Sequence, residues 1–251
     1  MTSIDMGIIL KNVSFAYGGS EKVLKDISFS ILPGTFLGIA GSNGSGKSTL
    51  TYLLNGLIPH FIEGKLEGEV MIDGIATSQK NVAYFSRKVG MVFQNPDFST
   101  FNLTVREEIQ FGLRNYHIDE GKEKIDRILQ QVGLEGYADR DPQSLSFGQK
   151  QKVSLAAVIA LDPAYIVLDE PSAMLDYRSS CELYSILRNL NKKGNTIIVV
   201  EHDTDFLYQF AEEVKVLNEG SVVLEGKTRD VFRKVRILNK LGIKIPNKRK
   251  K

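Results

Sequence analysis

Residues Gly41 to Ser48 read G-S-N-G-S-G-K-S, a glycine-rich loop that ends in Lys-Ser. The loop follows an apolar run, residues 36–40, and precedes a helix-like stretch from Lys47 to Leu57. A strand, such a loop and a helix in this order form a P-loop, where backbone N–H groups and the helix dipole suit a triphosphate. A chance match in a chain of this length has odds of roughly one in a hundred. The sequence therefore predicts a nucleotide-binding protein.

The P-loop pattern assigns a task to each of its residues. Lys47 is expected to reach the β- and γ-phosphates, and the hydroxyl of Ser48 is expected to bind Mg²⁺. The residues expected to contact the nucleotide here are Gly41, Ser42, Asn43, Gly44, Ser45, Gly46, Lys47, Ser48 and Thr49.

Composition limits the class of protein. With 251 residues, of which 42% are hydrophobic, the chain can bury a core as one large domain or as two lobes. The single cysteine, Cys181, excludes an internal disulfide and suits a reducing compartment. No apolar run approaches the roughly 18–20 residues that span a bilayer, and the polar residues 1–5 do not resemble a secretory signal. We therefore expect a soluble, cytoplasmic protein.

The net charge of +2 conceals an asymmetry along the chain. The last segment, Arg233 to Lys251, holds nine Lys or Arg and no acidic residue, which leaves a net charge of −7 for the rest. A basic tail on an acidic body argues against a nucleic-acid binder, whose basic surface would be broader. Residues 247–251 are expected to be solvated. Helical spacing predicts that the apolar residues before them pack against something: Val231, Phe232, Val235, Ile237, Leu238 and Leu241.

Strand and helix signals alternate along the chain, which predicts an α/β fold. Residues 104–138 mix apolar and charged side chains as a small helical subdomain does. An apolar strand at 165–168, an amphipathic helix that ends at Gly194 and a second apolar strand at 196–200 predict a βαβ unit. The other predicted strands are residues 8–13, 27–31, 70–72, 214–217 and 222–224, the last two as a closing hairpin.

Two adjacent acids, Asp169 and Glu170, follow the first strand of that unit. Open α/β sheets bind their ligands at the carboxyl ends of the strands. A carboxylate there is costly unless it is solvated, paired or metal-bound, and Mg²⁺ held by Ser48 and Asp169 would supply the opposite charge. Glu170 is then placed to deprotonate a water molecule as general base. The alternative is a pair of acids that opens a surface turn.

A second helix start reads Leu145-Ser146-Phe147-Gly148-Gln149. Taken alone, Ser146 and Gln149 match an ordinary capping box. In this chain the stretch lies between a P-loop and a buried strand that ends in Asp-Glu, in that fixed order. This arrangement resembles the ATPase subunit of an ABC transporter, and the resemblance covers essentially the whole chain.

The resemblance implies a fold and a division of the chain. The fold is α/β: a P-loop NTPase core with a RecA-like parallel sheet, an antiparallel β subdomain and an inserted α-helical subdomain. The ABC ATPase domain is expected over residues 1–230, with the helical subdomain at about 97–152, and the basic C-terminal extension over 231–251. The implied activity is ATP hydrolysis coupled to transport, with ATP and Mg²⁺ as cofactors.

Four further positions match motifs of this family. They are Gln94 of the Q-loop, Asp176 of the D-loop, the switch histidine His202, and Tyr17 of the A-loop, whose ring stacks on adenine. Singly, Tyr17 suits a strand-edge aromatic and His202 a core or capping histidine, but their places within the set favour the functional interpretation. The resemblance assigns catalysis to Glu170, His202, Gln94 and Lys47, and Mg²⁺ binding to Ser48, Gln94 and Asp169.

The resemblance further implies that two such subunits pair head to tail around two ATP molecules. Each nucleotide then lies between the P-loop of one subunit and the signature of the other, Ser146, Phe147, Gly148 and Gln149. Ser146 and N–H groups at the start of a helix suit an incoming γ-phosphate. Loss of that charge after hydrolysis would let the halves part.

Two residues depart from the family pattern. Phe147 occupies a signature position that is usually glycine, and Tyr177 follows the D-loop where many relatives have proline or a small residue. Because Ser146, Gly148 and Gln149 remain, we expect function to survive the first departure.

The transporter class is indicated by residues 93–97, Phe-Gln-Asn-Pro-Asp, together with residues 111–113 and 173–176. These look most like the ATPases of energy-coupling factor (ECF) transporters, which take up vitamins and transition-metal ions, although Phe98-Ser99 departs from the usual polar pair. The implied partners are a second ATPase subunit, identical or paralogous, a transmembrane coupling protein and a substrate-binding membrane protein. The implied location is the cytoplasmic face of the membrane, without nucleic acid.

Other ATPases of the superfamily fit less well. A chromosome-maintenance ATPase would need a long coiled coil between the P-loop and the signature, for which there is no room. A translation-associated protein would usually carry two sets of motifs, and this chain has one. An ABC ATPase of another importer or exporter, or one that serves a soluble assembly scaffold, stays open as an alternative.

Two contacts with partners are also expected. Residues 231–241 should form a helix that packs against the partner ATPase. The segment 95–103 should receive the membrane partner, with Phe98, Phe101 and Leu103 as apolar surface and Asp97 as a carboxylate for a basic side chain.

Overall fold

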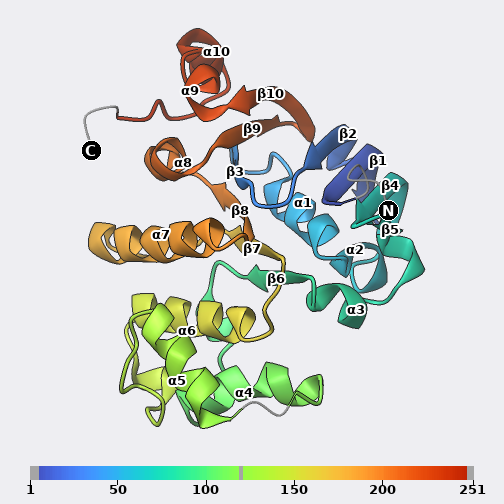
Figure 1. The fold of residues 1–251 in the computed structure, drawn as a ribbon. Coiled ribbons are helices and arrows are strands. Elements are labelled where there is room, and N and C mark those ends of the chain that lie inside the picture. The colour runs from blue at the N-terminus through green and yellow to red at the C-terminus, as the bar shows by residue number, and fades with distance from the viewer. Residues whose placement is uncertain (1–5, 119–120, 248–251) are drawn as a thin grey trace.

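The computed structural model describes residues 6–118 and 121–247. The polar start at residues 1–5 and the basic residues 248–251, on which the sequence made predictions, lie outside the described residues. Two sheets and the helices around them build the described part (Figure 1). The predicted α/β class is confirmed.

The larger sheet has six strands in the order β10-β9-β3-β8-β7-β6. The strands from β9 to β6 pair in parallel, and β10 pairs with β9 in the antiparallel sense. The six are β3 (Phe36–Gly41), β6 (Val89–Val92), β7 (Tyr165–Asp169), β8 (Thr196–Glu201), β9 (Glu213–Asn218) and β10 (Ser221–Lys227). Strands β3, β7 and β8 are buried along their whole length, and their sequences are apolar except for Thr196 and the two terminal acids, Asp169 and Glu201.

Alternate residues of the central strands enter two different cores. On β7, Ile166 and Leu168 belong to one core, and Tyr165 and Val167 belong to the other. The first core includes residues of the later helices, and the second includes Leu50 of the helix after the P-loop. Since both faces of the sheet are covered, polar groups collect at the carboxyl ends of its strands.

The smaller sheet is antiparallel, with the strand order β2-β1-β4-β5. Its strands are β1 (Ile8–Tyr17), β2 (Leu24–Ile31), β4 (Gly64–Ile72) and β5 (Ile75–Ala76). The predicted strands at 8–13, 27–31 and 70–72 are parts of β1, β2 and β4. The first six residues of β4 are exposed or half-buried, so their apolar pattern could not reveal them.

The helices connect these strands, and three of them form a group of their own. In Figure 1, α4 and α5 lie beyond α6 on the side away from the smaller sheet, and all three come between β6 and β7 in the chain. The helices are α1 (Lys47–Leu54), α2 (Leu57–His60), α3 (Val82–Ser86), α4 (Val105–Asn115), α5 (Lys122–Gln131), α6 (Phe147–Ile159), α7 (Tyr177–Lys192), α8 (Thr204–Phe210), α9 (Thr228–Val231) and α10 (Val235–Lys240). Helix α7 joins β7 to β8 and completes the predicted βαβ unit.

The C-terminal segment folds onto its own chain. The side chains of Phe232 and Leu238 are fully buried in the core that α7 and α8 also line. The ring of Tyr208 of α8 packs edge to face on the ring of Phe232, with the ring centroids 6.0 Å apart. The expectation that Phe232 and Leu238 pack against a partner subunit is therefore wrong. Instead of one helix, the segment forms the two short helices α9 and α10.

The chain then runs back along α8. The ammonium of Lys244 donates to Asp203 Oδ1 and to Asp205 Oδ2, both at 2.9 Å, and the hydroxyl of Thr204 donates to the carbonyl of Lys244. Farther on, the N–H of Asn247 donates to Asp205 Oδ1 at 2.6 Å. These bonds fasten the end of the described chain to the start of α8.

Candidate functional site

The glycine-rich loop lies where the sequence predicted it, between the end of β3 and the start of α1. Lys47, the first residue of α1, is 4% exposed, and its ammonium donates to the carbonyls of Gly41 and Ser42 at 3.0 Å. The residue before the helix, Gly46, has φ of 101° and provides no side-chain cap. The N–H groups of this helix start therefore remain available to an anion.

Two glycines of the loop cannot be replaced without strain. A Cβ on Gly46 would lie 2.7 Å from Leu24 Cδ2, and its positive φ already disfavours other residues. A Cβ on Gly41 would lie 2.5 Å from Ser45 Oγ and 2.6 Å from the carbonyl oxygen of Leu217. Close packing of the loop against its neighbours thus requires both glycines.

Four predicted residues meet beyond the carboxyl ends of the strands, with Glu170 following β7 and His202 following β8. His202 Nε2 lies 2.6 Å from Glu170 Oε1, and the ammonium of Lys47 lies 3.9 Å from the same oxygen. The amide of Gln94, after β6, donates to Glu170 Oε2 at 3.3 Å. The carboxylate of Glu170 is therefore the point at which the P-loop, the Q-loop and the switch histidine meet.

The electrostatics of Asp169 fit a bound cation. Asp169 is 7% exposed, and burial raises the pKa of its carboxyl, while a hydrogen bond from Ser48 and the charge of Lys47 act in the opposite direction. Its buried Oδ1 has no hydrogen-bond partner among the residues that the structure describes. Two hard oxygen ligands, the Ser48 hydroxyl and an unsatisfied carboxylate oxygen, are what Mg²⁺ prefers. The residues present thus fit this ion.

Lys47 is subject to the opposite balance. Burial lowers the pKa of its ammonium, and the carboxylates of Glu170 and Asp169 raise it again. Two acids and two carbonyls already offset part of the cost of burying the Lys47 ammonium. The ammonium is also placed where a further anion could bind to it. A phosphate oxygen is the partner that its position between the P-loop and Glu170 suits.

Tyr17 lies at the end of β1 next to the P-loop helix. Its hydroxyl is 2.9 Å from Thr49 Oγ1, and its ring packs edge to face on Phe15, with the ring centroids 5.0 Å apart. The structure therefore places Tyr17 beside the predicted nucleotide-contacting residues.

The signature residues form a second and separate helix start. Ser146 caps α6, its Oγ accepting from the N–H of Gln149 at 3.4 Å, and the Gln149 side chain accepts from the N–H of Ser146 at 3.0 Å. Phe147 is the first helical residue, so its backbone is of the ordinary kind for a residue with a side chain. Gly148 packs against Ser179 of α7, where a Cβ would lie 3.1 Å from Ser179 Oγ.

The D-loop residue Asp176 is the cap of that same helix α7. Its carboxylate accepts from the N–H and from the hydroxyl of Ser179, both at 2.8 Å. The signature and the D-loop are therefore neighbours through Ser179, and neither belongs to the cluster around Glu170.

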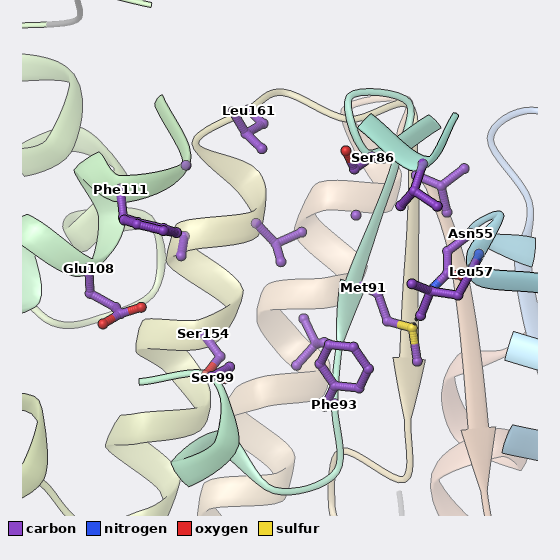
Figure 2. A pocket seen from close by; sticks show the side chains of 17 residues that line it. Asn55, Leu57, Ser86, Met91, Phe93, Ser99, Glu108, Phe111, Ser154 and Leu161 are labelled. Carbon is purple, nitrogen blue, oxygen red and sulfur yellow. Dashed lines mark hydrogen bonds between the residues drawn. The ribbon is translucent and has the colours of Figure 1, made fainter. Parts of the chain in front are cut away.

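A cavity of about 310 Å³ opens between β6, α4 and α6 (Figure 2). Met91 and Phe93 line it from β6 and the residue after it, Phe111 from α4, and Leu161 from the loop after α6. Phe93 directly precedes Gln94, so the cavity borders the Q-loop.

The loop beside this cavity is held by its own chain. Glu108 of α4 is 5% exposed, and its Oε2 accepts from the N–H groups of Phe101 and Asn102 at 3.0 Å. Asp97 pairs at 2.6 Å with the ammonium of Lys150, the residue that directly follows the signature. Because the Asp97 side chain is still 47% exposed, its expected contact with a basic side chain of a partner stays a prediction. Phe98 and Leu103 are exposed by 86% and 81%, and Phe101 by 62%.

One buried acid near the site was not singled out by the sequence. Glu201, the last residue of β8, is 2% exposed and accepts hydrogen bonds from Ser172 and Tyr184. The sequence did offer a signal for this residue, because a glutamate follows four apolar residues of the strand and directly precedes His202.

The loop, the buried lysine and the polar ends of β7 and β8 together define a P-loop nucleotide-binding protein. A family model described as ABC transporter matches residues 24–173. The chain therefore belongs to the ATP-binding subunits of ABC transporters, and it is an ATPase of that family.

Similar proteins extend the match to nearly the full chain. A putative ABC transporter ATP-binding protein of Pyrococcus abyssi is 45% identical over 97% of this chain and 89% of its own length. The energy-coupling factor transporter ATP-binding protein EcfA of Methanocaldococcus jannaschii is 37% identical over 94% of this chain and 84% of its own.

Two solved structures share the fold. The cbiO1 protein of Clostridium perfringens, described as part of the ABC transporter complex cbiONQ, has a TM-score of 0.81, with 30% identity and 95% of both chains covered. The ATP-binding cassette MJ0796, solved as a dimer in a post-hydrolysis state bound to ADP and Pi, has a TM-score of 0.76 and 31% identity, over 88% of this chain and 99% of its own. In residues 6–118 and 121–247, no helix is both long and apolar enough to cross a bilayer.

Proposed function

We propose that this ATPase energises an uptake transporter of the energy-coupling factor type, for a vitamin or a transition-metal ion. The observation that carries the catalytic part is the convergence of Lys47, Gln94 and His202 on the carboxylate of Glu170. The similarity to an EcfA protein and to a component of a cbiONQ complex supports the transporter class.

In the proposed reaction, the P-loop and Tyr17 hold ATP. The N–H groups at the start of α1 and the ammonium of Lys47 bind its phosphates, while the Tyr17 ring stacks on the adenine. Ser48, Asp169 and Gln94 would hold Mg²⁺, which supplies charge neutralisation at the phosphates. Asp169 is suited to this because its buried Oδ1 has no partner among the described residues.

Glu170 is the proposed general base. Its carboxylate takes a proton from the attacking water, and Gln94 orients that water through the amide that now contacts Glu170 Oε2. His202, 2.6 Å from Glu170 Oε1, holds the carboxylate on one side and is placed to contact the γ-phosphate. Glu170, Gln94 and His202 thus all act at the position of the attacking water and the γ-phosphate.

The second half of the site is proposed to come from another subunit. Ser146, Gly148 and Gln149 lie at a helix start outside the Glu170 cluster, so they are free to approach the nucleotide of a partner. We propose a dimer, of identical or paralogous chains, that closes on ATP and opens after hydrolysis, with Asp176 at the same interface. The dimeric form of a similar cassette supports this arrangement.

The membrane components are proposed to dock on the cavity beside the Q-loop. A cytoplasmic segment of a transmembrane coupling protein would cover Phe98, Phe101 and Leu103, and a separate membrane protein would bind the substrate. The subunit would then work at the cytoplasmic face of the membrane. This proposal divides the chain into an ATPase domain, residues 1–230 with a helical insertion at about 97–152, and an extension, residues 231–251.

Replacement of Glu170 by glutamine tests the chemistry. We expect Glu170→Gln to bind ATP and Mg²⁺, to accumulate as a dimer in gel filtration, and to hydrolyse at least ~100-fold more slowly, because only the base is lost. The matched control is Glu225→Gln, since Glu225 pairs with Lys215 at the far edge of the sheet. A Glu170→Gln protein that hydrolyses ATP at the normal rate would falsify the assignment.

Replacement of two exposed phenylalanines tests the docking surface. We expect Phe98→Ser with Phe101→Ser to remove the chain from membranes of cells that produce it, while the isolated subunit keeps its ATPase rate. The control is Phe61→Ser, because Phe61 is also exposed, by 75%. Equal membrane binding of both variants would place the docking site elsewhere. A chain that never reaches the membrane would favour the alternative of a soluble assembly.

A further inference from the structure

Glu201, the last residue of β8, joins the end of this strand to the turn that follows β7. Its Oε1 accepts from the N–H of Ser172 at 3.1 Å, from the hydroxyl of Ser172 at 2.6 Å and from the hydroxyl of Tyr184 at 3.0 Å. The backbone of Asp203 also donates to this carboxylate. Burial raises the pKa of Glu201, and these hydrogen bonds oppose the rise.

The residues that Glu201 contacts flank the proposed catalytic pair. Ser172 lies two residues after Glu170, and Asp203 directly follows His202. Glu201 and His202 are adjacent, and while His202 contacts Glu170, Glu201 binds the turn beyond it. Two side-chain contacts, from His202 to Glu170 and from Glu201 to Ser172, therefore connect the end of β7 to the end of β8.

The backbone of Glu170 needs such support. Its φ is +47°, a left-handed conformation that is costly for a residue with a side chain. Two backbone bonds hold it: its N–H donates to the carbonyl of Val200 on β8 at 2.9 Å, and its carbonyl accepts from the N–H of Ala173 at 3.1 Å. The bonds of Ser172 to Glu201 hold the turn from after it. A residue in a rare conformation persists only where its surroundings fix it from several sides.

We propose that Glu201 is a positioning residue for ATP hydrolysis, which holds the turn after Glu170 through Ser172 and so keeps the Glu170 carboxylate against His202. The proposal rests on the role of Glu170 as general base given above. We call Glu201, Ser172 and Tyr184 the clamp. The Tyr184 hydroxyl donates to the same oxygen of Glu201, and the Tyr184 ring stacks on Phe206 with ring centroids 4.7 Å apart and an interplanar angle of 8°. The hydrogen bonds of the clamp reach no residue of the P-loop, although the charge of Glu201 raises the pKa of Lys47. Substitutions at Ser172 or Tyr184 leave that charge in place, so they should act on turnover and not on nucleotide affinity.

The chain offers a matched pair of variants for the test. Tyr184 and Tyr165 are both fully buried, and each donates to a carboxylate, Tyr184 to Glu201 at 3.0 Å and Tyr165 to Asp73 at 2.5 Å. Tyr165 begins β7, at the end of the strand away from Glu170. Replacement by phenylalanine removes one hydroxyl at either position and leaves the ring in place.

We expect Tyr184→Phe and Ser172→Ala each to lower turnover about tenfold, the rate equivalent of one hydrogen bond in a buried site. Turnover is measured per bound nucleotide, with a fluorescent ATP analogue counting the sites, so that partly unfolded protein does not contribute. The affinity for the analogue should change less than about twofold in both variants. Tyr165→Phe should leave turnover per site unchanged. Equal effects of Tyr184→Phe and Tyr165→Phe would overturn the proposal.

A double variant separates positioning from general loosening. If the clamp acts through Glu170, Ser172→Ala should add less than about twofold to the loss that Glu170→Gln causes alone, measured in single-turnover reactions. A further tenfold loss in the double variant would show that Ser172 acts elsewhere. Should Glu170→Gln by itself keep normal turnover, the proposed base is wrong and the clamp has nothing to position. Normal turnover of Tyr184→Phe, together with the loss of turnover in Glu170→Gln, would overturn the clamp proposal and leave the assignment of Glu170 as base intact.

Discussion

Helices α1 and α6 both begin at residues proposed to face phosphate, yet their first turns are built in opposite ways. Before α1, Gly46 has a left-handed backbone and makes no side-chain cap, and the first turn carries no acidic residue. Before α6, Ser146 forms a complete capping box with Gln149. The first N–H groups of α1 thus have no side-chain acceptor, whereas two backbone N–H groups at the start of α6 donate to side chains of the same chain.

This difference indicates how each end is used. The P-loop end of α1 is complete only when an anion binds, so a nucleotide should remain there through much of the cycle. The signature end of α6 is stable without a ligand, so it can approach and leave a nucleotide without exposing unpaired groups. A helix start that must separate from its phosphate in every cycle benefits from such a cap.

The largest expected effect concerns α1 alone. Lys47→Ala should weaken ATP binding by about 100-fold or more, because the variant loses a buried ammonium beside the phosphates. The measurement is a titration with a fluorescent ATP analogue. Lys88→Ala serves as control, since Lys88 pairs with Asp73 just before β6 and should leave the affinity unchanged.

A substitution at α6 should separate turnover from binding. Ser146→Arg places a bulky cation at the proposed interface, and we expect it to lower ATP turnover by about 100-fold while the affinity of the isolated chain for ATP stays within about twofold. A comparable loss of affinity would mean that Ser146 contacts nucleotide in its own subunit, and the contrast between the two helices would fail.

A milder change measures what the cap contributes without ligand. Gln149→Ala removes half of the capping box and the bond from Gln149 to the hydroxyl of Tyr137, so it should lower the free energy of unfolding by about 1 kcal/mol. Urea unfolding in the absence of nucleotide provides the measurement. Gln131→Ala, at the exposed end of α5, should change the stability by no more than about 0.5 kcal/mol.

The smallest effect is expected at the departure from the family pattern. Phe147→Gly should leave turnover within several-fold, because the proposed phosphate contacts come from the neighbours of Phe147 and its backbone is already helical. The glycine should reduce stability by at most about 1 kcal/mol. Steady-state ATPase assays settle the matter, and a loss as large as that of Ser146→Arg would show that the phenylalanine ring takes part.

The sequence predicted the buried centre of the fold well. Strands β7 and β8 are apolar on both faces because helices cover both, and that pattern is visible without a structure. It predicted the exposed parts poorly. The first half of β4 pairs with β1 through backbone bonds that its side chains do not reveal, and α3 is too short for a periodic pattern.

The candidate site was also predicted in part. The motifs identified Lys47, Glu170 and His202, and the topology explains why they meet, since the segments that carry them follow the carboxyl ends of the neighbouring parallel strands β3, β7 and β8. Their individual roles stay predictions. Contacts between distant residues could not be read from the chain: the bond from Lys150 to Asp97 and the clamp at Glu201 both depend on how helices pack.

The bonds of the C-terminal segment to α8 set a practical limit on shortened forms of this protein. A chain cut after Gly242 would lose Ile243 from the core and the contacts that fasten Asp203 and Asp205, only one and three residues from the switch histidine. Such a chain would retain every recognised motif and still have a looser histidine loop. Minimal versions for biochemical work should therefore extend at least to Asn247, and a purification tag is better attached beyond that residue than in place of it.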